Sequence, residues 1–320
     1  MRACLTHLAD FRASGKPSPA CEPTGVVTFV QAMLLAVLQG VSELFPVSSL
    51  GHTVLLPALL RWNVDESSES FLAFVVVLHL GTALALIVFY RNDWIAIIRA
   101  FIASIVRGRF TDDRDERTAW LLVAATIPVG VLGVLLESYV KKLFASPVPV
   151  SLFLFANGFI MLLGEWLRRR QHPQTNSAAP PNSAQKQYRR LDQLTPRDGV
   201  FVGFAQSLAL LPGISRSGSA IVAGLLRDLH HEDAARYSFL LATPVILAAS
   251  LLEFPKLFAP DAHVVLIQAV VGGIVAGITA YASVAFLTRY FRHNDLSPFA
   301  WYCIAAGAIS FILFATKVIA

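Results

Sequence analysis

The chain has 320 residues, of which 55% are hydrophobic and only 15% are charged, and its mean hydropathy is +0.60. A typical soluble protein has about 25% charged residues, so this composition cannot supply the polar surface of a soluble enzyme. The net charge of +5 is typical of the loops of a membrane protein rather than of nucleic-acid binding. The composition therefore predicts an all-helical protein that crosses the membrane several times.

The chain begins with a polar extension, residues 1–25, which lacks the apolar core of a signal peptide. The apolar stretch that follows, Pro23–Leu60, contains a single charged residue, Glu43, and is interrupted by Pro46-Val-Ser-Ser-Leu-Gly51. Proline, glycine and serine break helices, so each arm is mostly too short to span a membrane alone. Broken backbone at membrane depth must be buried in protein or line a polar cavity. A re-entrant helical hairpin is therefore predicted.

Three uncharged or nearly uncharged segments of about 20 residues come next and are predicted to be membrane spans: Phe71–Tyr90, Ala119–Ser138 and Val148–Leu167. Between the first two spans, Trp94–Val106 contains Arg99 and is either a short interfacial helix or a distorted span. The histidine inside the first span, His79, is interpreted as structural or solvated.

The second half of the chain repeats this order. A loop rich in Arg, Pro, Ser and Gln, residues 168–197, is predicted to be flexible. The apolar stretch Gly199–Leu226 contains one charged residue, Arg216, and is interrupted by Pro212-Gly-Ile-Ser-Arg-Ser-Gly218, which predicts a second hairpin. His230 and His231, in the loop that follows, are interpreted as surface residues. Three further spans are predicted at Ser238–Phe254, His263–Thr288 and Ser297–Thr316.

A hairpin and three spans in each half predict an inverted repeat, with residues 26–167 as the first half and 198–320 as the second. Because three spans reverse the direction of the chain, the two hairpins would enter from opposite faces and meet near the middle. The loops that this arrangement places in the cytoplasm hold 17 of the 26 Lys and Arg residues, as the positive-inside rule requires. If Trp94–Val106 crosses the membrane, the repeat fails.

The first hairpin contains an acid, hydroxyls and an imidazole. Gln39 and Glu43 are four residues apart and lie on one helical face, and Ser48, Ser49 and His52 follow the break. A carboxylate inside a membrane segment is costly and usually marks a functional site. The alternative is a structural network, in which a serine caps the second helix and the histidine binds a backbone carbonyl.

The second hairpin is suited to anions. Arg216 stays charged and presents a fork that matches phosphate oxygens, and Ser215, Ser217 and the nearby glycines add donors at the start of a helix. The alternative is a salt bridge between Arg216 and Glu43 that holds the two halves together. One hairpin then offers acid–base and nucleophilic groups and the other an anion clamp, so the predicted substrate is a phosphate on a lipid.

Two motifs resemble those of the bacterial undecaprenyl-diphosphate phosphatases, the bacitracin-resistance type. They are Leu38-Gln-Gly-Val-Ser-Glu-Leu-Phe-Pro-Val-Ser-Ser-Leu-Gly-His52 and Pro212–Gly218, and the similarity covers roughly residues 26–318. The family's acidic pair falls on Gln39 and Glu43, so one acid is replaced by an amide here. Ala220 stands where the second motif usually ends in threonine.

The resemblance implies removal of one phosphate from undecaprenyl diphosphate at the bacterial inner membrane, with a divalent cation, Mg²⁺ or Ca²⁺. It implies Ser49 as nucleophile, His52 as its activator or acid–base group, Glu43 as base or metal ligand with Gln39, and Arg216 as the diphosphate anchor. Attack by His52 itself is the rival assignment. The substrate-binding residues implied are Gln39, Ser48, Gly213, Ser215 and Ser217.

Two other functions were weighed. The acid-phosphatase-like lipid phosphatases need a histidine six residues after the arginine, and Val222 stands there. A transporter or flippase for an anionic polyprenyl phosphate fits the inverted repeat, but it should tolerate loss of Ser49. The expected partners are the lipid substrate and the membrane, and nucleic acid is not expected. Self-association as a homodimer is an open alternative.

Overall fold

The computed structural model describes residues 27–65, 68–144, 146–171, 188–253, 255 and 265–318. Within these ranges the regular secondary structure is helical, apart from isolated bridge residues at Val64 and between Arg189 and Leu229. The extension 1–25 and much of the 168–197 loop lie outside the described residues. The predicted all-helical class is confirmed.

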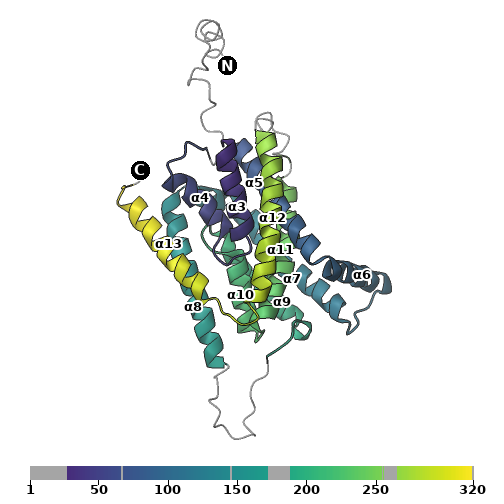
Figure 1. Ribbon diagram of the computed structural model, residues 1–320. Helices are drawn as coiled ribbons and strands as arrows, with labels where there is room; N and C mark the ends of the chain where they lie inside the picture. Colours follow the sequence, from purple (N-terminus) through teal and green to yellow (C-terminus); the bar gives the residue numbers. More distant parts are fainter. Residues whose placement is uncertain are drawn as a thin grey trace, which may run out of the picture.

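The helices follow the predicted order along the chain (Figure 1). Their bounds are α3 (Phe29–Ser42), α4 (Ser49–Leu59), α5 (Glu69–Phe89), α6 (Arg91–Arg107), α7 (Arg114–Phe144), α8 (Pro147–Gln171), η2 (Leu191–Gln193), α9 (Pro196–Ser207), η3 (Leu208–Leu210), α10 (Arg216–Leu226), α11 (His231–Glu253), α12 (Leu266–Tyr290) and α13 (Ser297–Ala315).

Six of the described helices, α5, α7, α8, α11, α12 and α13, are long and apolar enough to cross a membrane. They coincide with the six predicted spans, so the protein is a multi-pass membrane protein. Their outward surfaces carry many exposed large hydrophobic side chains, such as Ile127 in α7 and Ile278 in α12. Lipid tails rather than water are the solvent that suits these surfaces.

Both hairpins form where the sequence predicts them. The first consists of α3 and α4, and the second of α9, η3 and α10. In Figure 1, α3 and α4 lie in the upper part of the molecule, and α9 and α10 lie in the lower part. A capping box at Thr28 begins α3, and a second one at Thr195 begins α9. The breaks follow Ser42 and Leu210, where the chain reaches the proline-containing tips.

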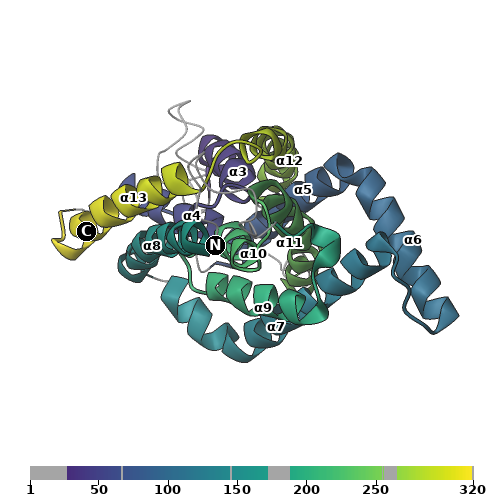
Figure 2. The same ribbon diagram turned by 90° about the horizontal axis from the view of Figure 1, so that it is seen from below.

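The segment Trp94–Val106 lies within α6, which is not among the helices suited to spanning. Its axis runs across the direction of α8 and α12 in Figure 1, and Figure 2 shows it projecting from the side of the bundle. Exposed isoleucines recur every three or four residues along it, including Ile98 and Ile102, and so form an apolar face. This is the geometry of an interfacial helix, so the first of the two alternatives for this segment is supported.

The two halves pack against each other through their hairpins. The first arm of each hairpin lies against the second span of the opposite half, since α3 packs on α12 and α9 packs on α7. Glycines permit this close approach: a Cβ on Gly40 would lie 2.4 Å from the carbonyl oxygen of Ala276, and one on Gly203 would lie 2.5 Å from that of Ala125. The reciprocal packing accords with the inverted repeat, which itself stays a prediction.

Candidate active site

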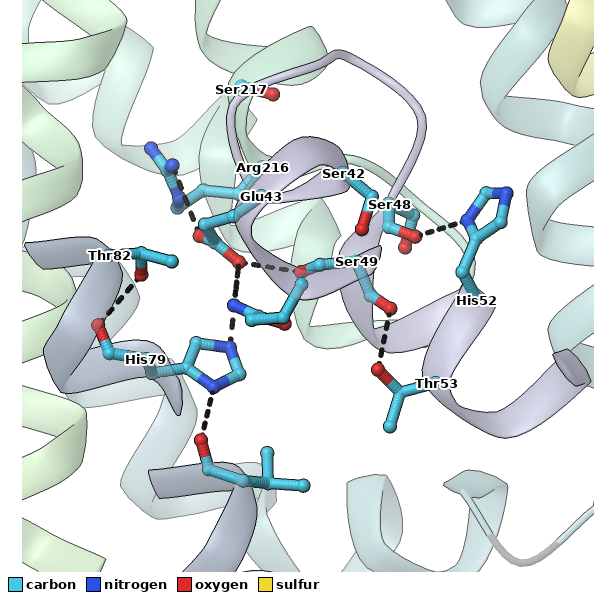
Figure 3. A network of polar contacts seen from close by, with 12 residues as sticks. Ser42, Glu43, Ser48, Ser49, His52, Thr53, His79, Thr82, Arg216 and Ser217 are labelled. Atoms are coloured by element: carbon cyan, nitrogen blue, oxygen red, sulfur yellow. Dashed lines mark hydrogen bonds and ion pairs between the residues drawn. The ribbon is translucent and has the colours of Figure 1, made fainter. Parts of the chain in front are cut away.

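The two hairpin tips meet at a salt bridge inside the bundle (Figure 3). Glu43 follows the last residue of α3, and Arg216 is the first residue of α10. Nη2 of Arg216 lies 3.3 Å from Oε1 of Glu43, and the side chains are only 12% and 7% exposed. The salt bridge between Arg216 and Glu43, which the sequence analysis gave as the alternative to an anion site, is therefore confirmed. Because each charge is buried, removing either partner leaves the other uncompensated.

The second carboxylate oxygen of Glu43 faces the first hairpin. The hydroxyl of Ser49 donates a hydrogen bond to Oε2 at 2.6 Å, and the amide of Gln39 donates to the same oxygen at 3.1 Å. The i, i+4 spacing of Gln39 and Glu43 thus places both on one face, as predicted. Ser49 therefore has a proton acceptor in direct contact, which is the arrangement that activates a serine nucleophile.

The backbone at the first tip explains how Ser49 reaches the carboxylate. Ser48 adopts a positive φ of 70°, and its hydroxyl accepts a hydrogen bond from the N–H of Gly51 at 3.2 Å. Positive φ is strained for a residue with a side chain, and such strain concentrates at functional sites. Ser48 is therefore the cap of α4, and Ser49 becomes the first residue of that helix.

The serines of the second tip make hydrogen bonds that stabilise the backbone there. Ser215 caps α10 by accepting from the N–H of Gly218 at 3.1 Å, and the hydroxyl of Ser217 donates to the carbonyl of Phe45 at 3.1 Å. Gly213 has a φ of 111°, and a Cβ there would lie 2.3 Å from the carbonyl oxygen of Val150. The three predicted substrate-binding residues of this tip thus build the turn and join it to its neighbours.

Two helix amino-terminal ends point into the site, those of α4 and α10. Helix amino termini carry unpaired N–H groups and partial positive charge, which favour a bound anion. Arg216 adds a full charge, and its Nε is buried without a hydrogen-bond partner among the described residues. Its Nη1 donates to the carbonyl of Ser238 in α11 at 3.3 Å. The guanidinium is therefore held from two sides, by Glu43 of the first hairpin and by α11.

His52 is not brought to Ser49 or Glu43. Its Nδ1 lies 2.7 Å from the carbonyl oxygen of Ser48, and its Nε2 lies 2.8 Å from the hydroxyl of Tyr302 in α13. The imidazole and the Tyr302 ring also stack, with centroids 5.7 Å apart. Figure 3 shows the His52 ring on the far side of Ser48 from the carboxylate. The contact with the carbonyl of Ser48 is the one expected under the structural alternative, in which this histidine binds a backbone carbonyl.

His79 lies beside Glu43 and belongs to the site, although the sequence analysis interpreted this histidine as structural or solvated. Its Nε2 lies 3.5 Å from Oε2 of Glu43, and its Nδ1 lies 2.9 Å from the carbonyl oxygen of Val75. The sequence signal was available, since His79 is the single Asp, Glu, Lys, Arg or His residue among the 20 residues Phe71–Tyr90. An ionisable residue inside a span is a functional candidate by default.

Comparisons with known proteins show the family of this chain. A family model described as bacitracin resistance protein BacA matches residues 32–309. The chain belongs to the BacA family. A relative from Mycolicibacterium paratuberculosis named undecaprenyl-diphosphatase is 48% identical over 305 residues, which cover 92% of this chain and 100% of the relative. One from Frankia alni named undecaprenyl-diphosphatase 2 is 45% identical, with 90% and 98% covered, and one from Gluconacetobacter diazotrophicus is 45% identical, with 90% and 97% covered.

The divalent cation that the BacA resemblance implies can be compared with the donors present. Among the described residues, no group of three or more His, Cys, Asp or Glu side chains gathers in one place. Near Glu43 the available donors are its carboxylate, the hydroxyl of Ser49 and Nε2 of His79. Mg²⁺ is often held by one or two carboxylates together with substrate phosphates. The donors therefore fit a cation shared between Glu43 and a substrate, and they do not form a complete protein cage.

One correction lies outside the site. His231 was interpreted as a surface residue, but it is only 5% exposed, and its Nε2 lies 2.6 Å from Oε1 of Glu165 in α8. The same carboxylate oxygen accepts the N–H of Leu296 at 3.1 Å. The start of α11, the end of α8 and the α12–α13 connection are therefore joined by one buried carboxylate. Contacts between segments so far apart in the chain leave no local pattern in the sequence.

Proposed function

We propose that this protein hydrolyses undecaprenyl diphosphate to undecaprenyl phosphate and inorganic phosphate, and so recycles the lipid carrier of cell-wall synthesis. The single observation that carries the proposal is the 2.6 Å hydrogen bond from Ser49 to Glu43, made beside a buried arginine at the meeting point of two hairpins. The names of the BacA relatives supply the substrate. Such an activity accounts for bacitracin resistance, and it belongs in the bacterial plasma membrane.

In the first step the hydroxyl of Ser49 attacks the terminal phosphorus of the diphosphate. A bond forms between Oγ and phosphorus, and the bond from that phosphorus to the bridging oxygen breaks. Glu43 accepts the hydroxyl proton on Oε2, which is already its hydrogen-bond partner. The leaving group is undecaprenyl phosphate, whose new terminal oxygen takes up this proton from Glu43, so that the carboxylate is free again for the second step.

In the second step water attacks the phosphorus of the phosphoserine and Glu43 accepts a proton from that water. The bond between phosphorus and Oγ of Ser49 breaks, Glu43 returns the proton to Oγ, and phosphate departs. Arg216 and the amino termini of α4 and α10 stabilise the charge on the phosphate oxygens in both steps. Gln39 holds the carboxylate toward Ser49 through its 3.1 Å hydrogen bond. A cation bound by Glu43 and the substrate would neutralise further phosphate charge.

The contacts of His52 bear on the rival nucleophile. Both of its ring nitrogens are engaged, by the carbonyl of Ser48 and the hydroxyl of Tyr302, whereas Ser49 faces a proton acceptor. This supports Ser49. The transport alternative receives no support from the names of the BacA relatives. Self-association as a homodimer stays a prediction.

The test is phosphate release from undecaprenyl diphosphate by the purified protein in detergent micelles, with and without Mg²⁺ or Ca²⁺. Ser49→Ala and Arg216→Ala are each expected to lower the rate at least 100-fold, about the loss that follows removal of one catalytic group. Ser42→Ala is the matched control, because Ser42 is equally buried next to Glu43 but donates only to the carbonyl of Leu38 in its own helix.

The outcomes separate the enzyme from the transporter. Release by the wild type that fails in Ser49→Ala but persists in Ser42→Ala supports the proposal. A wild-type rate no higher than that of Arg216→Ala would overturn it. A Ser49→Ala variant that releases phosphate normally would remove the serine mechanism.

A further inference from the structure

One buried amide touches both hairpin tips at once. Asn157, in the middle of α8, is 0% exposed. Its Nδ2 donates to the carbonyl of Pro46 in the first tip at 3.1 Å, and its Oδ1 accepts the N–H of Ser215 in the second tip at 3.0 Å. The same Nδ2 lies 3.4 Å from Sγ of Cys303 in α13. The sequence analysis did not identify Asn157 as a site residue.

The two backbone groups that Asn157 binds lie next to the reacting side chains. Pro46 stands midway between Glu43 and Ser49, and Ser215 directly precedes Arg216. Both groups belong to broken backbone inside the membrane region, where neither water nor a helical partner is at hand. A buried N–H or carbonyl left without a partner costs about 1–3 kcal/mol. The amide therefore satisfies one orphaned group from each hairpin with a single side chain.

The second tip is also seated directly on α8, which makes this helix the fixed reference for both hairpins. A Cβ on Gly213 would lie 2.3 Å from the carbonyl oxygen of Val150 and 2.7 Å from the backbone nitrogen of Leu154, both in α8. The tip cannot shift toward the helix, and the Ser215–Asn157 hydrogen bond opposes movement away from it. The first tip is tied to the same helix through Pro46.

We propose that Asn157 is a positioning residue that fixes Ser49 and Glu43 of one hairpin relative to Arg216 of the other. This inference rests on the proposed phosphatase function for its consequence, because the reaction needs the nucleophile and the phosphate clamp in one geometry. A displacement of about 1 Å can lower a rate about 100-fold. Asn157 touches no reacting atom and acts only through the two backbones.

The kinetic test compares Asn157→Leu with Gln206→Leu. Gln206 is the matched control because it is also a 0% exposed amide that donates across helices, to the carbonyl of Ala125 at 2.8 Å, but it touches neither tip. We expect Asn157→Leu to lower kcat about 100-fold with KM within about threefold of the wild type. Asn157→Asp keeps the acceptor for Ser215 and should retain more activity than Asn157→Leu. Equal losses of kcat in Asn157→Leu and Gln206→Leu would overturn the proposal.

A double-variant cycle separates positioning from loss of stability. In the wild type and in Gln206→Leu, Arg216→Lys should lower kcat by the same factor. In Asn157→Leu the same change should lower kcat by a much smaller factor, because the guanidinium is no longer aligned with Ser49. An unchanged factor in the Asn157→Leu background would show that Asn157 does not act on the pair.

A structural readout keeps the inference testable even if the wild type released no phosphate, which would contradict the proposed function alone. The Cβ of Pro46 lies 3.3 Å from an ideal Cβ on Gly218, close to the Cβ separation of about 3.5–4.5 Å in disulfides. Pro46→Cys and Gly218→Cys should therefore cross-link the tips under mild oxidation, in a background without the native cysteines. We expect efficient cross-linking in the double-cysteine protein that keeps Asn157 and in the same protein with Gln206→Leu. We expect a clear loss of cross-linking when Asn157→Leu is added. Equal cross-linking in all three would overturn the positioning role.

Discussion

At the scale of residues, the site is built around one carboxylate. Glu43 lies in a segment where an isolated charge is costly, and it is compensated by the guanidinium of Arg216 and by the hydrogen bonds of Ser49 and Gln39. The two carboxylate oxygens of Glu43 have different partners: Oε1 faces the guanidinium of Arg216, and Oε2 faces the hydroxyl of Ser49. This division allows one side chain to hold the two hairpins together and to accept the proton of Ser49.

Glu43→Gln tests the acceptor role. The amide keeps the size of the side chain but cannot take a proton, so we expect the rate of phosphate release to fall about 1000-fold, within the range for loss of a general base. The rate should be compared with that of Ser42→Ala at equal amounts of folded protein. A Glu43→Gln variant with more than a tenth of the wild-type rate would rule out Glu43 as the base.

His79→Gln tests the residue that the sequence interpretation missed. Its Nε2 lies 3.5 Å from the carboxylate oxygen that bonds Ser49, so we expect kcat/KM to fall about tenfold, equivalent to about 1.4 kcal/mol in the barrier. His293→Gln, at an exposed position, is the control for loss of a histidine. Equal activity of the two variants would place His79 outside the catalytic machinery.

The residue-scale predictions succeeded where a local pattern carried them. The i, i+4 spacing placed Gln39 beside Glu43, and the single charge in each broken stretch identified Glu43 and Arg216 as a pair. The contact of His52 with Tyr302 could not be foreseen, because Tyr302 lies 250 residues further along the chain. Asn157 gave no signal either, since its partners are backbone groups of both hairpins.

At the scale of elements, the important feature is a pair of broken helices whose second arms begin at the site. The arms start at Ser49 and Arg216, so the amino-terminal ends of α4 and α10 are directed at the same place. Proline and serine patterns predicted both breaks. The sequence left open whether Trp94–Val106 crosses the membrane, because its composition suits an interface and a distorted span alike.

Gly213→Ala tests how tightly the second tip is seated. A Cβ there would overlap the carbonyl oxygen of Val150 at 2.3 Å, and the φ of 111° disfavours a side chain. We expect a loss of about 2 kcal/mol in stability or more, seen as a lower midpoint of thermal unfolding in detergent. Gly130→Ala is the control, because a Cβ on Gly130 meets nothing within 4 Å. Equal midpoints would mean that the tip can move away from α8.

At the scale of the whole molecule, the two halves are interleaved rather than side by side, since the first arm of each hairpin packs on a span of the other half. The site therefore exists only when both halves are folded together. The inverted repeat predicts that the charged loop between α6 and α7 lies in the cytoplasm and that the connection after α4 lies on the other face.

Single cysteines can test this orientation in a background without the native cysteines. Arg61 follows α4 and Arg109 follows α6, and both are exposed. In intact spheroplasts, a membrane-impermeant maleimide should label Arg61→Cys and should label Arg109→Cys only after lysis. Labelling of both positions before lysis would contradict the predicted orientation.

The account depends most on attack by Ser49, and capture of the covalent intermediate tests it most directly. Undecaprenyl diphosphate labelled with radioactive phosphorus at its terminal phosphate is mixed with the enzyme, the reaction is quenched within a turnover, and the labelled peptide is mapped. We predict label on Ser49 in the wild type and none on this peptide in Ser49→Ala. Label on His52, or normal turnover by Ser49→Ala, would contradict the account.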